Sequence, residues 1–365
     1  MPASVPVSSL ICIPEFEKAA RSALSRMTWD YYRSGADAER TLRENVRAYR
    51  RWEIHYRVLV DVSLRDLSTS VLGIPVSMPI LIAPTAYHRL AHPDGELATA
   101  RAAAEAGTIY TLSTLATTSI EDVARVSQGP LWFQLYVHKD RELTQSLVAR
   151  AEAAGFQAIV LTVDTPVLGR RIRDVRNGFG LPAGLVMANL VDAAGMAGIQ
   201  SSSALARYIA SRHDASLTWR DVEWLRGMTR LPVLLKGIVR PDDALRAVDA
   251  GAAGIVVSNH GARQLDGAPA TLDVLPRIVD AVAGRVPVLV DGGIRWGSDV
   301  LKALALGARA VMIGRPVLWG LAVGGSAGVR SVLEIFREEL STAMALAGCS
   351  SIETIDRSLV EKRVR

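Results

Sequence analysis

The sequence predicts an α/β protein in which eight parallel strands close into a (β/α)8 TIM barrel, with an N-terminal helical cap and a long lid after the fourth strand. From residue 79 onward, short apolar and β-branched runs alternate with Ala- and Leu-rich helical stretches, a pattern typical of parallel βα units. Eight such runs occur, the number that closes this barrel. Polar residues follow the ends of the runs, where such barrels carry their functional groups.

We expect one domain of 365 residues, because α/β barrels of this size are common as single folding units. Its predicted parts are a cap at residues 1–78, a barrel at 79–350 with a lid at about 172–217, and a tail at 351–365. The predicted strands are residues 79–84, 110–113, 131–137, 158–164, 232–237, 254–260, 287–292 and 310–314. The predicted helices are residues 95–106, 120–127, 142–154, 219–229, 242–249, 272–282 and 299–306.

Two of these helices begin with expected capping pairs, Thr118 with Glu121 and Thr218 with Asp221. A hydroxyl followed three residues later by a carboxylate is typical of a helix N-terminus. Periodicity alone also permits an open doubly wound sheet. The polar residues at the strand ends favour the closed barrel instead.

Composition excludes several classes of protein. Apolar residues make up 49% and charged residues 22%, which excludes a wholly disordered, collagenous or coiled-coil chain. The net charge of +5 is spread without a basic block, so we expect no nucleic-acid partner, whereas a small acidic substrate would suit it. Cys12 and Cys349 are too few for a disulfide framework or a zinc site. The N-terminus has no basic segment before its apolar run, so we expect a cytoplasmic protein without a signal peptide.

The lid is the one long interval between predicted strands. Its middle, residues 178–199, contains only Asn189 and Asp192 as strongly polar side chains and approaches the length of a membrane span. Pro182 and five glycines would break a lipid-exposed helix, so we expect no stable membrane insertion and favour an active-site lid. A peripheral membrane patch is the alternative.

The densest polar cluster is SNHGARQLD, at residues 258–266 after the sixth strand. It would bring the imidazole of His260 and the guanidinium of Arg263 to the barrel mouth, a base beside a natural carboxylate partner. The structural alternative is an ordinary hydrogen-bonded histidine. Histidines 55, 88, 92, 138 and 213 have no such neighbours in the sequence, and we expect no metal site.

Three further clusters follow other strands. In LTVDTPVLGRR, residues 161–171, Asp164 could orient His260 and Arg171 could bind a carboxylate, although a turn cap and a solvated arginine are the structural alternatives. DGGIR at 291–295 and IGRP at 313–316 are typical of phosphate-binding loops after the last two strands. Lys236 would face an anion or reach the barrel rim.

These motifs, with FQLY and APTA and in this order, resemble the FMN-dependent α-hydroxy-acid oxidases and dehydrogenases, a family that includes glycolate oxidase, lactate oxidase and mandelate dehydrogenase. The resemblance runs from about residue 31 to 349. Residues 87–97, 113–115 and 170–182 look most similar to the family's hydroxymandelate oxidases. It implies an FMN-containing barrel that oxidises an (S)-2-hydroxy acid to the 2-keto acid, and a homotetramer or octamer.

The resemblance also implies roles for individual residues. His260 would be the base with Asp164 behind it, and Arg171 and Arg263 would bind the substrate carboxylate, with Tyr31 and Tyr136 as hydrogen-bond donors. The residues expected around the FMN ring are Pro84, Thr85, Ala86, Ser113, Gln134, Thr162, Lys236 and Ser258. Those expected around its phosphate are Asp291, Gly292, Gly293, Arg295, Gly314 and Arg315.

One departure from the family bears on substrate choice. Leu115 stands where the glycolate oxidases have a tryptophan, so the pocket should be wider, and Tyr87 could supply an aromatic wall. We therefore expect a bulky or aromatic substrate such as mandelate or 4-hydroxymandelate, with glycolate, lactate or a long-chain 2-hydroxy acid as alternatives. O2 is the expected electron acceptor, and a quinone or a protein is the alternative.

Three other functions compete with this one. An FMN-dependent isomerase would not need two arginines aimed at one carboxylate. A dehydrogenase acting through a covalent cysteine is disfavoured because neither cysteine follows a predicted strand. A flavin-binding scaffold without catalysis remains the non-enzymatic alternative.

Overall fold

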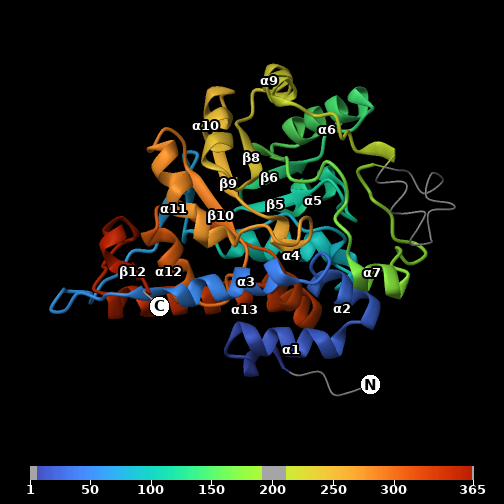
Figure 1. The fold of residues 1–365 in the computed structure, drawn as a ribbon. Helices are drawn as coiled ribbons and strands as arrows, with labels where there is room; N and C mark the ends of the chain where they lie inside the picture. The colour runs from blue at the N-terminus through green and yellow to red at the C-terminus, as the bar shows by residue number, and fades with distance from the viewer. Residues whose placement is uncertain (1–5, 191–210, 364–365) are drawn as a thin grey trace.

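The computed structural model describes residues 6–190 and 211–363, and within them eight parallel strands form a closed barrel (Figure 1). Each barrel strand pairs with the next along the chain, and the last pairs with the first. Every predicted run overlaps one strand, so the predicted barrel is confirmed and the open sheet is excluded. The strands are β4 (Ile80–Ile82), β5 (Tyr110–Ser113), β6 (Leu131–Leu135), β7 (Ala158–Thr162), β8 (Val233–Ile238), β9 (Gly254–Val257), β10 (Val288–Asp291) and β11 (Ala310–Ile313).

Alternate strand residues belong to two separate cores. In β7, Ala158 and Val160 join a cluster made almost entirely of strand residues, which fills the barrel interior. Their neighbours Ile159 and Leu161 join the cluster that contains the helices. This alternation follows from the period of two along a strand, and it buries both faces of the sheet. A hairpin of β2 (Thr69–Val71) and β3 (Ile74–Val76) adds two valines to the interior cluster.

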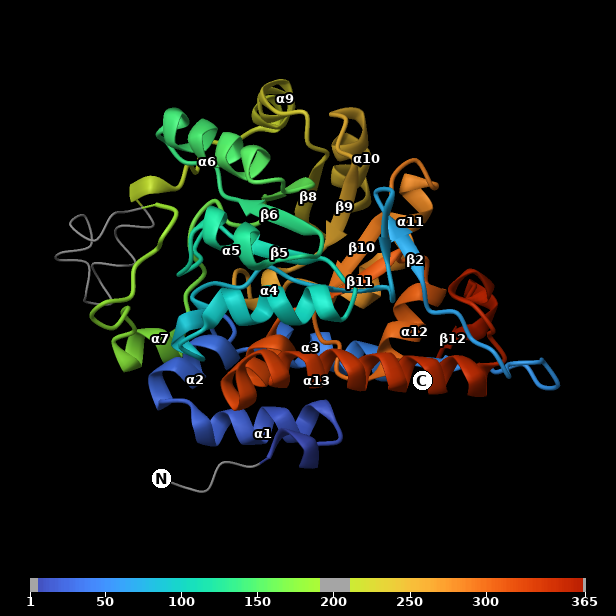
Figure 2. The same cartoon turned by 180° about the vertical axis from the view of Figure 1, so that it is seen from behind.

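Helices cover the outside of the barrel, and α13 packs against α4 and α12 (Figure 2). Within the described residues α13 is the one helix long and apolar enough to cross a membrane, yet 61% of its most apolar window is buried in this fold. The barrel helices are α4 (Gly95–Glu105), α5 (Ile120–Val126), α6 (Arg141–Ala153), α9 (Trp219–Met228), α10 (Pro241–Asp249), α11 (Thr271–Val282), α12 (Gly297–Ala305) and α13 (Arg315–Ala347).

The two predicted helix caps had different outcomes. The pair Thr218 and Asp221 forms a capping box at α9, as predicted. The prediction of Thr118 with Glu121 was wrong by one position, because Ser119 accepts the hydrogen bond at the start of α5. Thr118 instead donates its hydroxyl to a buried carboxylate, which competes with capping.

The N-terminal segment forms three helices, α1 (Ile13–Ala23), α2 (Arg26–Arg33) and α3 (Arg40–Ala48). After them β1 (Trp52–Ile54) pairs antiparallel with β12 (Val360–Lys362) near the C-terminus. Helix α1 lies along α13 (Figure 1). The cap reaches the barrel mouth through its backbone, because Ala36 N–H donates to Ala262 O at 2.8 Å. The cap therefore contacts the loops after the strands.

The part of the predicted lid at residues 172–190 begins with the short helix α7 (Ile172–Asn177), which packs against α2. Arg173 forms ion pairs with Asp30 at 3.3 Å and Glu39 at 3.0 Å. Just after α7, the ring of Phe179 stacks on that of Tyr31 with centroids 4.0 Å apart. Residues 191–210, including Asp192, lie outside the described residues. The first part of the lid is thus fastened to the cap.

Candidate active site

One cavity of about 590 Å³ lies at the C-terminal ends of the barrel strands. Such a volume is typical of a site for a cofactor and a small substrate. Asp164 and Ser258 lie behind its wall, bonded to residues that line it. The other predicted site residues line it: Tyr31, Pro84, Thr85, Ala86, Ser113, Leu115, Gln134, Tyr136, Thr162, Arg171, Lys236, His260, Arg263, Asp291, Gly292, Gly293, Arg295, Gly314 and Arg315.

The loop after β9 presents His260 to the cavity in an unusual backbone conformation. His260, Gly261 and Ala262 all have φ near +60°, which is uncommon and costly for residues other than glycine. Ser258 Oγ accepts from His260 N–H at 3.0 Å, and Asn259 Oδ1 accepts from Ala262 N–H at 3.0 Å. These side chains hold the turn that the backbone alone would not favour.

Asp164 fixes the tautomer of His260. His260 Nδ1 lies 2.8 Å from Asp164 Oδ1. Burial alone would raise the pKa of Asp164, but His260 and Lys236 hold it below its usual value, so the carboxylate is ionised. An ionised carboxylate only accepts, so Nδ1 carries the proton and Nε2 is left as the acceptor. Burial lowers the pKa of His260 against the raising effect of Asp164, and the ring is a neutral base at neutral pH.

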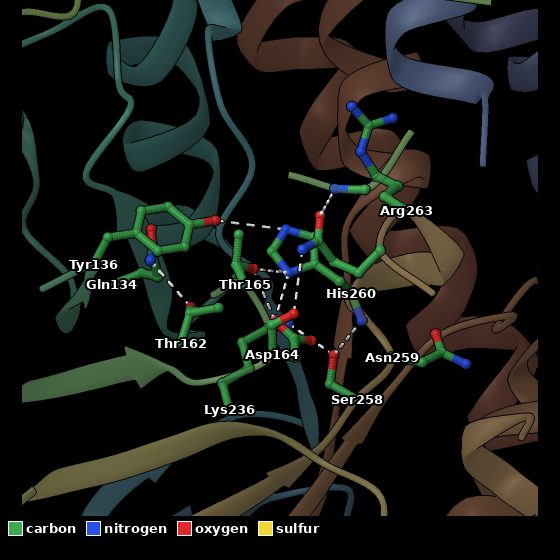
Figure 3. Close-up of polar contacts among 12 residues, drawn as sticks. Gln134, Tyr136, Thr162, Asp164, Thr165, Lys236, Ser258, Asn259, His260 and Arg263 are labelled. Carbon is green, nitrogen blue, oxygen red and sulfur yellow. Dashed lines mark hydrogen bonds and ion pairs between the residues drawn. The ribbon is translucent and has the colours of Figure 1, made fainter. Parts of the chain in front are cut away.

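Figure 3 shows two hydroxyl groups beside this pair. Tyr136 Oη lies 3.5 Å from His260 Nε2. Thr165 Oγ1 lies 3.1 Å from Asp164 Oδ1 and 3.3 Å from His260 Nδ1. Sequence analysis missed Thr165, although its place directly after Asp164 in the motif could have indicated it. Each ring nitrogen of His260 therefore has one hydroxyl group near it, that of Tyr136 at Nε2 and that of Thr165 at Nδ1.

A glycine in β8 makes room for Asp164. Gly237 has φ +117°, and a Cβ there would lie 2.6 Å from Asp164 Cβ. A side chain at position 237 would therefore push Asp164 away from the imidazole.

Lys236 is buried and paired. Its Nζ lies 2.8 Å from Asp291 Oδ2 and donates to Ser258 Oγ at 2.8 Å. Burial lowers the pKa of Lys236, but the carboxylates of Asp291 and Asp164 together outweigh this effect. The pKa is therefore above its usual value and the amine stays charged. The carboxylate of Asp291 thus faces Lys236, and Asp291 Oδ1 has no hydrogen-bond partner.

The two predicted carboxylate-binding arginines differ in direction. Arg171 Nη2 donates to Gln264 Oε1 at 3.3 Å, and burial, with Arg263 nearby, lowers the pKa of Arg171 to about 10. The Arg263 guanidinium lies 4.8 Å above the Tyr31 ring and donates to the carbonyls of Tyr31 and Ser34, pointing away from His260 (Figure 3). Within the described residues no carboxylate lies at ion-pair distance from either guanidinium, although Asp174 is close enough to raise the pKa of Arg171, so both arginines could take an anion.

The two predicted phosphate loops meet at the other end of the cavity. Gly293 has φ +83°, and a Cβ there would lie 2.0 Å from the carbonyl oxygen of Asn45. Burial, then neighbouring arginines including Arg263 and Arg295, hold the pKa of Arg315 well below its usual value. Buried like charges of this kind favour a bound anion. Glycine backbone beside two guanidinium groups therefore fits a phosphate.

A chain of hydrogen bonds crosses the wall between β5 and β7. Gln134 Oε1 accepts from Ser113 Oγ at 3.2 Å and from Thr114 N–H at 3.2 Å. Gln134 Nε2 donates to Thr162 Oγ1 at 3.0 Å. These bonds settle which way the amide faces, so the wall presents a defined set of donors and acceptors to a polar ring.

Aromatic and aliphatic side chains form the remaining wall. Tyr87 lies 5.7 Å from Tyr31 between ring centroids, its N–H donates to Leu115 O at 3.2 Å, and Phe179 stacks on Tyr31. Sequence analysis missed Phe179, although it is the one aromatic residue among positions 172–190. It also missed His213, whose ring lies 4.6 Å from that of Tyr136, because no local pattern marks that contact.

A parallel barrel with an oriented base, two arginines in the cavity wall and glycine- and arginine-rich loops suits an enzyme that binds a phosphorylated cofactor and an acidic substrate. The family model described as FMN-dependent dehydrogenase matches residues 20–362. The chain belongs to this family, as its sequence motifs predicted, and its cofactor is FMN.

Relatives and solved structures agree with this assignment. L-lactate oxidase of Nostoc sp. is 56% identical over 360 residues, which cover 97% of this chain and 99% of that protein. The 2-hydroxyacid oxidase 1 of Homo sapiens is 54% identical over 358 residues and 97% of each chain. A crystal structure of mandelate oxidase with (S)-4-hydroxymandelic acid has a TM-score of 0.93 at 47% identity and covers 98% of this chain and 100% of that one. The chain is therefore an enzyme of the 2-hydroxy acid oxidase type.

The residues of the cavity fit FMN. The Gly and Arg loops would bind its phosphate, and Lys236 with the chain of hydrogen bonds through Gln134 would face its polar ring edge. Among residues 6–190 and 211–363, no three His, Cys, Asp or Glu side chains gather as a metal site would require.

Proposed function

We propose that this protein oxidises an (S)-2-hydroxy acid with a bulky or aromatic side chain to the 2-keto acid and reduces O2 to hydrogen peroxide. The observation that carries the reaction is the 2.8 Å contact of His260 Nδ1 with Asp164 at the cavity wall. A neutral imidazole with an unprotonated Nε2 is the base that such an oxidation needs.

Two arginines orient the substrate. Arg171 and Arg263 bind its carboxylate, since a guanidinium offers paired donors in the geometry of a carboxylate. For this, the Arg263 guanidinium has to leave the carbonyls of Tyr31 and Ser34 and turn into the cavity. Tyr31 and Tyr136 donate hydrogen bonds to the carboxylate or hydroxyl end. With the carboxylate bound, the substrate's α-carbon and hydroxyl group face Nε2 of His260.

His260 then accepts a proton at Nε2, either from the α-carbon or from the hydroxyl group. Both routes need the same base in the same place. Asp164 stabilises the imidazolium that forms, because its ionised carboxylate accepts the Nδ1 proton. Bound FMN supplies the acceptor for the two electrons. Lys236 adds a fixed positive charge to the cavity, which favours the negative charge that develops there.

The width of the apolar wall supports a bulky side chain. Leu115 lines the cavity where a larger residue would fill it, and Tyr87 and Phe179 offer aromatic faces. Rings of this kind favour an aromatic partner through offset or edge-to-face contacts. The similarity to mandelate oxidase agrees with such a substrate.

Lactate is the second candidate substrate. The Nostoc L-lactate oxidase is 56% identical to this chain, compared with 47% for the mandelate oxidase structure. Most of the identical positions counted over the whole chain belong to the barrel and not to the few residues that would contact the substrate side chain. We therefore base the choice of substrate on those wall residues and not on overall identity.

Turnover with enantiopure acids tests the proposal. Purified holoenzyme is supplied with (S)-mandelate, (S)-4-hydroxymandelate, (S)-lactate or glycolate, and oxygen uptake and peroxide are both measured. We expect the highest kcat/KM for an aromatic acid, with one peroxide for each oxygen consumed and no turnover of (R)-mandelate. A clear preference for lactate or glycolate would overturn the bulky-substrate proposal. Fast anaerobic bleaching of the flavin followed by slow reoxidation in air would overturn O2 as the acceptor.

A further inference from the structure

A fully buried histidine lies behind the cavity wall and takes no part in the reaction described above. His88 is 0% exposed, and both of its ring nitrogens contact hydroxyl groups. Nε2 lies 2.6 Å from Thr85 Oγ1, and Nδ1 lies 3.0 Å from Thr99 Oγ1. Thr85 lines the cavity three residues after the end of β4, so His88 contacts the cavity through one hydroxyl group.

A buried carboxylate fixes the position of His88. Glu96, which is also 0% exposed, accepts from the backbone N–H of His88 at 3.1 Å and from that of Thr117 at 2.7 Å. It also accepts from the hydroxyl groups of Thr117 and Thr118. The loops after β4 and β5 are thereby tied to one group, and the imidazole has little freedom to turn.

The hydrogen-bond inventory assigns the protons. Burial lowers the pKa of His88 against the raising effect of Glu96, so the ring is neutral, with one donor and one acceptor. Thr99 Oγ1 has its own acceptor, the Gly95 carbonyl four residues earlier, at 3.5 Å. In the tautomer that this geometry favours, Nδ1 donates to Thr99 and Nε2 accepts the hydroxyl proton of Thr85. The Thr85 oxygen is left with lone pairs alone toward the cavity.

We propose that His88 is a positioning residue that turns the Thr85 hydroxyl into a pure acceptor and thereby raises the reduction potential of the bound FMN. The proposal rests on FMN as the cofactor and on the place of Thr85 in the cavity wall. It does not depend on which hydroxy acid is oxidised.

The expected direction of the change in reduction potential follows from how the hydrogen bonding of the flavin ring changes on reduction. A flavin ring nitrogen that accepts in the oxidised state carries a hydrogen after two-electron reduction. An acceptor-only oxygen disfavours the first state and favours the second. Without His88, the Thr85 hydroxyl can rotate and donate to the oxidised ring, which lowers the potential.

The experiment measures the FMN potential in the holoprotein by anaerobic chemical reduction against a reference dye. His88→Leu removes both ring nitrogens, whereas His88→Gln keeps a carbonyl that can accept from Thr85. Thr85→Val removes the hydroxyl at similar volume, and the double variant completes a cycle. His138→Leu is the matched control, since His138 is equally buried and does not line the cavity.

We expect His88→Leu to lower the equilibrium constant for reduction about tenfold, which for a two-electron couple is about 30 mV. His88→Gln should retain most of the potential, and His138→Leu should not change it. In the Thr85→Val background, His88→Leu should have no further effect.

Three results would overturn the proposal. A potential that rises in His88→Leu would reverse the assigned protons. Additive shifts in the double variant would show that His88 acts without Thr85, as a core residue would. A Thr85→Val variant with unchanged potential and FMN affinity would show that this hydroxyl does not face the ring. Because no hydroxy acid is present, a failure of the substrate proposal leaves these readouts unaffected.

Discussion

The side-chain amides of Asn45 and Asn259 bond to each other in both directions, at 2.9 Å and 2.8 Å. Asn45 belongs to cap helix α3, and Asn259 precedes His260 in the loop after β9. Asn259 Oδ1 also accepts from Ala262 N–H, so one amide pair fastens the left-handed turn to the cap. The carbonyl of Asn45 packs so closely on Gly293 that no side chain fits there. The cap therefore secures both the base loop and a phosphate loop.

Asn45→Asp should lower kcat while it has only a small effect on the thermal unfolding of the protein. The substitution replaces the amide donor with a second oxygen facing Asn259 Oδ1, and a buried hydrogen bond lost in this way costs about 1–3 kcal/mol. We expect kcat to fall about 5- to 100-fold with KM little changed, measured by steady-state kinetics together with thermal unfolding. Asn189→Asp changes another buried amide, which caps the start of α5, and serves as the control. An equal loss of kcat in both variants would contradict the assignment.

The pH profile should report His260. The base is active when neutral, so activity is present above its pKa and is lost as pH falls through it. Since burial holds this pKa below its usual value, the acidic limb of kcat/KM should lie below about pH 6.5.

Asp164→Ala should separate the orientation of His260 from its basicity. Because Asp164 raises the pKa of His260, its loss should move the acidic limb to still lower pH, while the plateau falls about 10²- to 10⁴-fold. Asp94→Ala, which removes the carboxylate 3.7 Å from His92 outside the cavity, should leave the profile unchanged. A limb displaced to higher pH would refute the pairing.

Arg171→Lys should raise KM for the hydroxy acid about 10- to 100-fold, because the charge is kept and the paired donors are lost. The measurement is steady-state kinetics with the preferred acid, and Arg176→Lys, at an exposed position of α7 outside the cavity lining, is the control. If both variants have the KM of the parent enzyme, Arg171 does not bind the carboxylate.

Leu115→Trp should change substrate preference. A larger ring at this wall removes space, so kcat/KM for mandelate should fall at least tenfold relative to glycolate, an effect typical of a filled apolar pocket. Competition between the two acids in one assay measures the ratio directly. Leu346→Trp, at an exposed position of α13, controls for the added indole. An unchanged ratio of kcat/KM for mandelate and glycolate would show that the side chain of the substrate does not bind against residue 115.

Arg315→Met should weaken FMN binding. Charge-assisted hydrogen bonds contribute about 1.5–3 kcal/mol, so the dissociation constant of FMN should rise about 10- to 100-fold in a fluorescence titration of the apoprotein. Arg330→Met lies on the same helix with an exposed side chain and should bind FMN as the parent does. Equal affinity in both variants would exclude Arg315 from the phosphate site.

Local sequence patterns were sufficient to locate the strands of the barrel. The short apolar and β-branched runs and the helical stretches between them predicted all eight strands, because a parallel strand that is covered on both faces needs apolar residues at successive positions. The carboxyl ends of parallel strands meet at one edge, so polar residues that follow different strands, such as Asp164 and His260, were expected together.

Only tertiary structure decided the relations between side chains that no periodicity connects. Asn45 and Asn259 are 214 positions apart, and their pairing depends on how the cap packs on the barrel. The turn of Arg263 toward the cap and the stacking of Phe179 on Tyr31 have the same origin. The sequence by itself therefore determined the barrel and the ends of its strands. Packing decided the direction of each functional group, because that direction depends on contacts made across the whole fold.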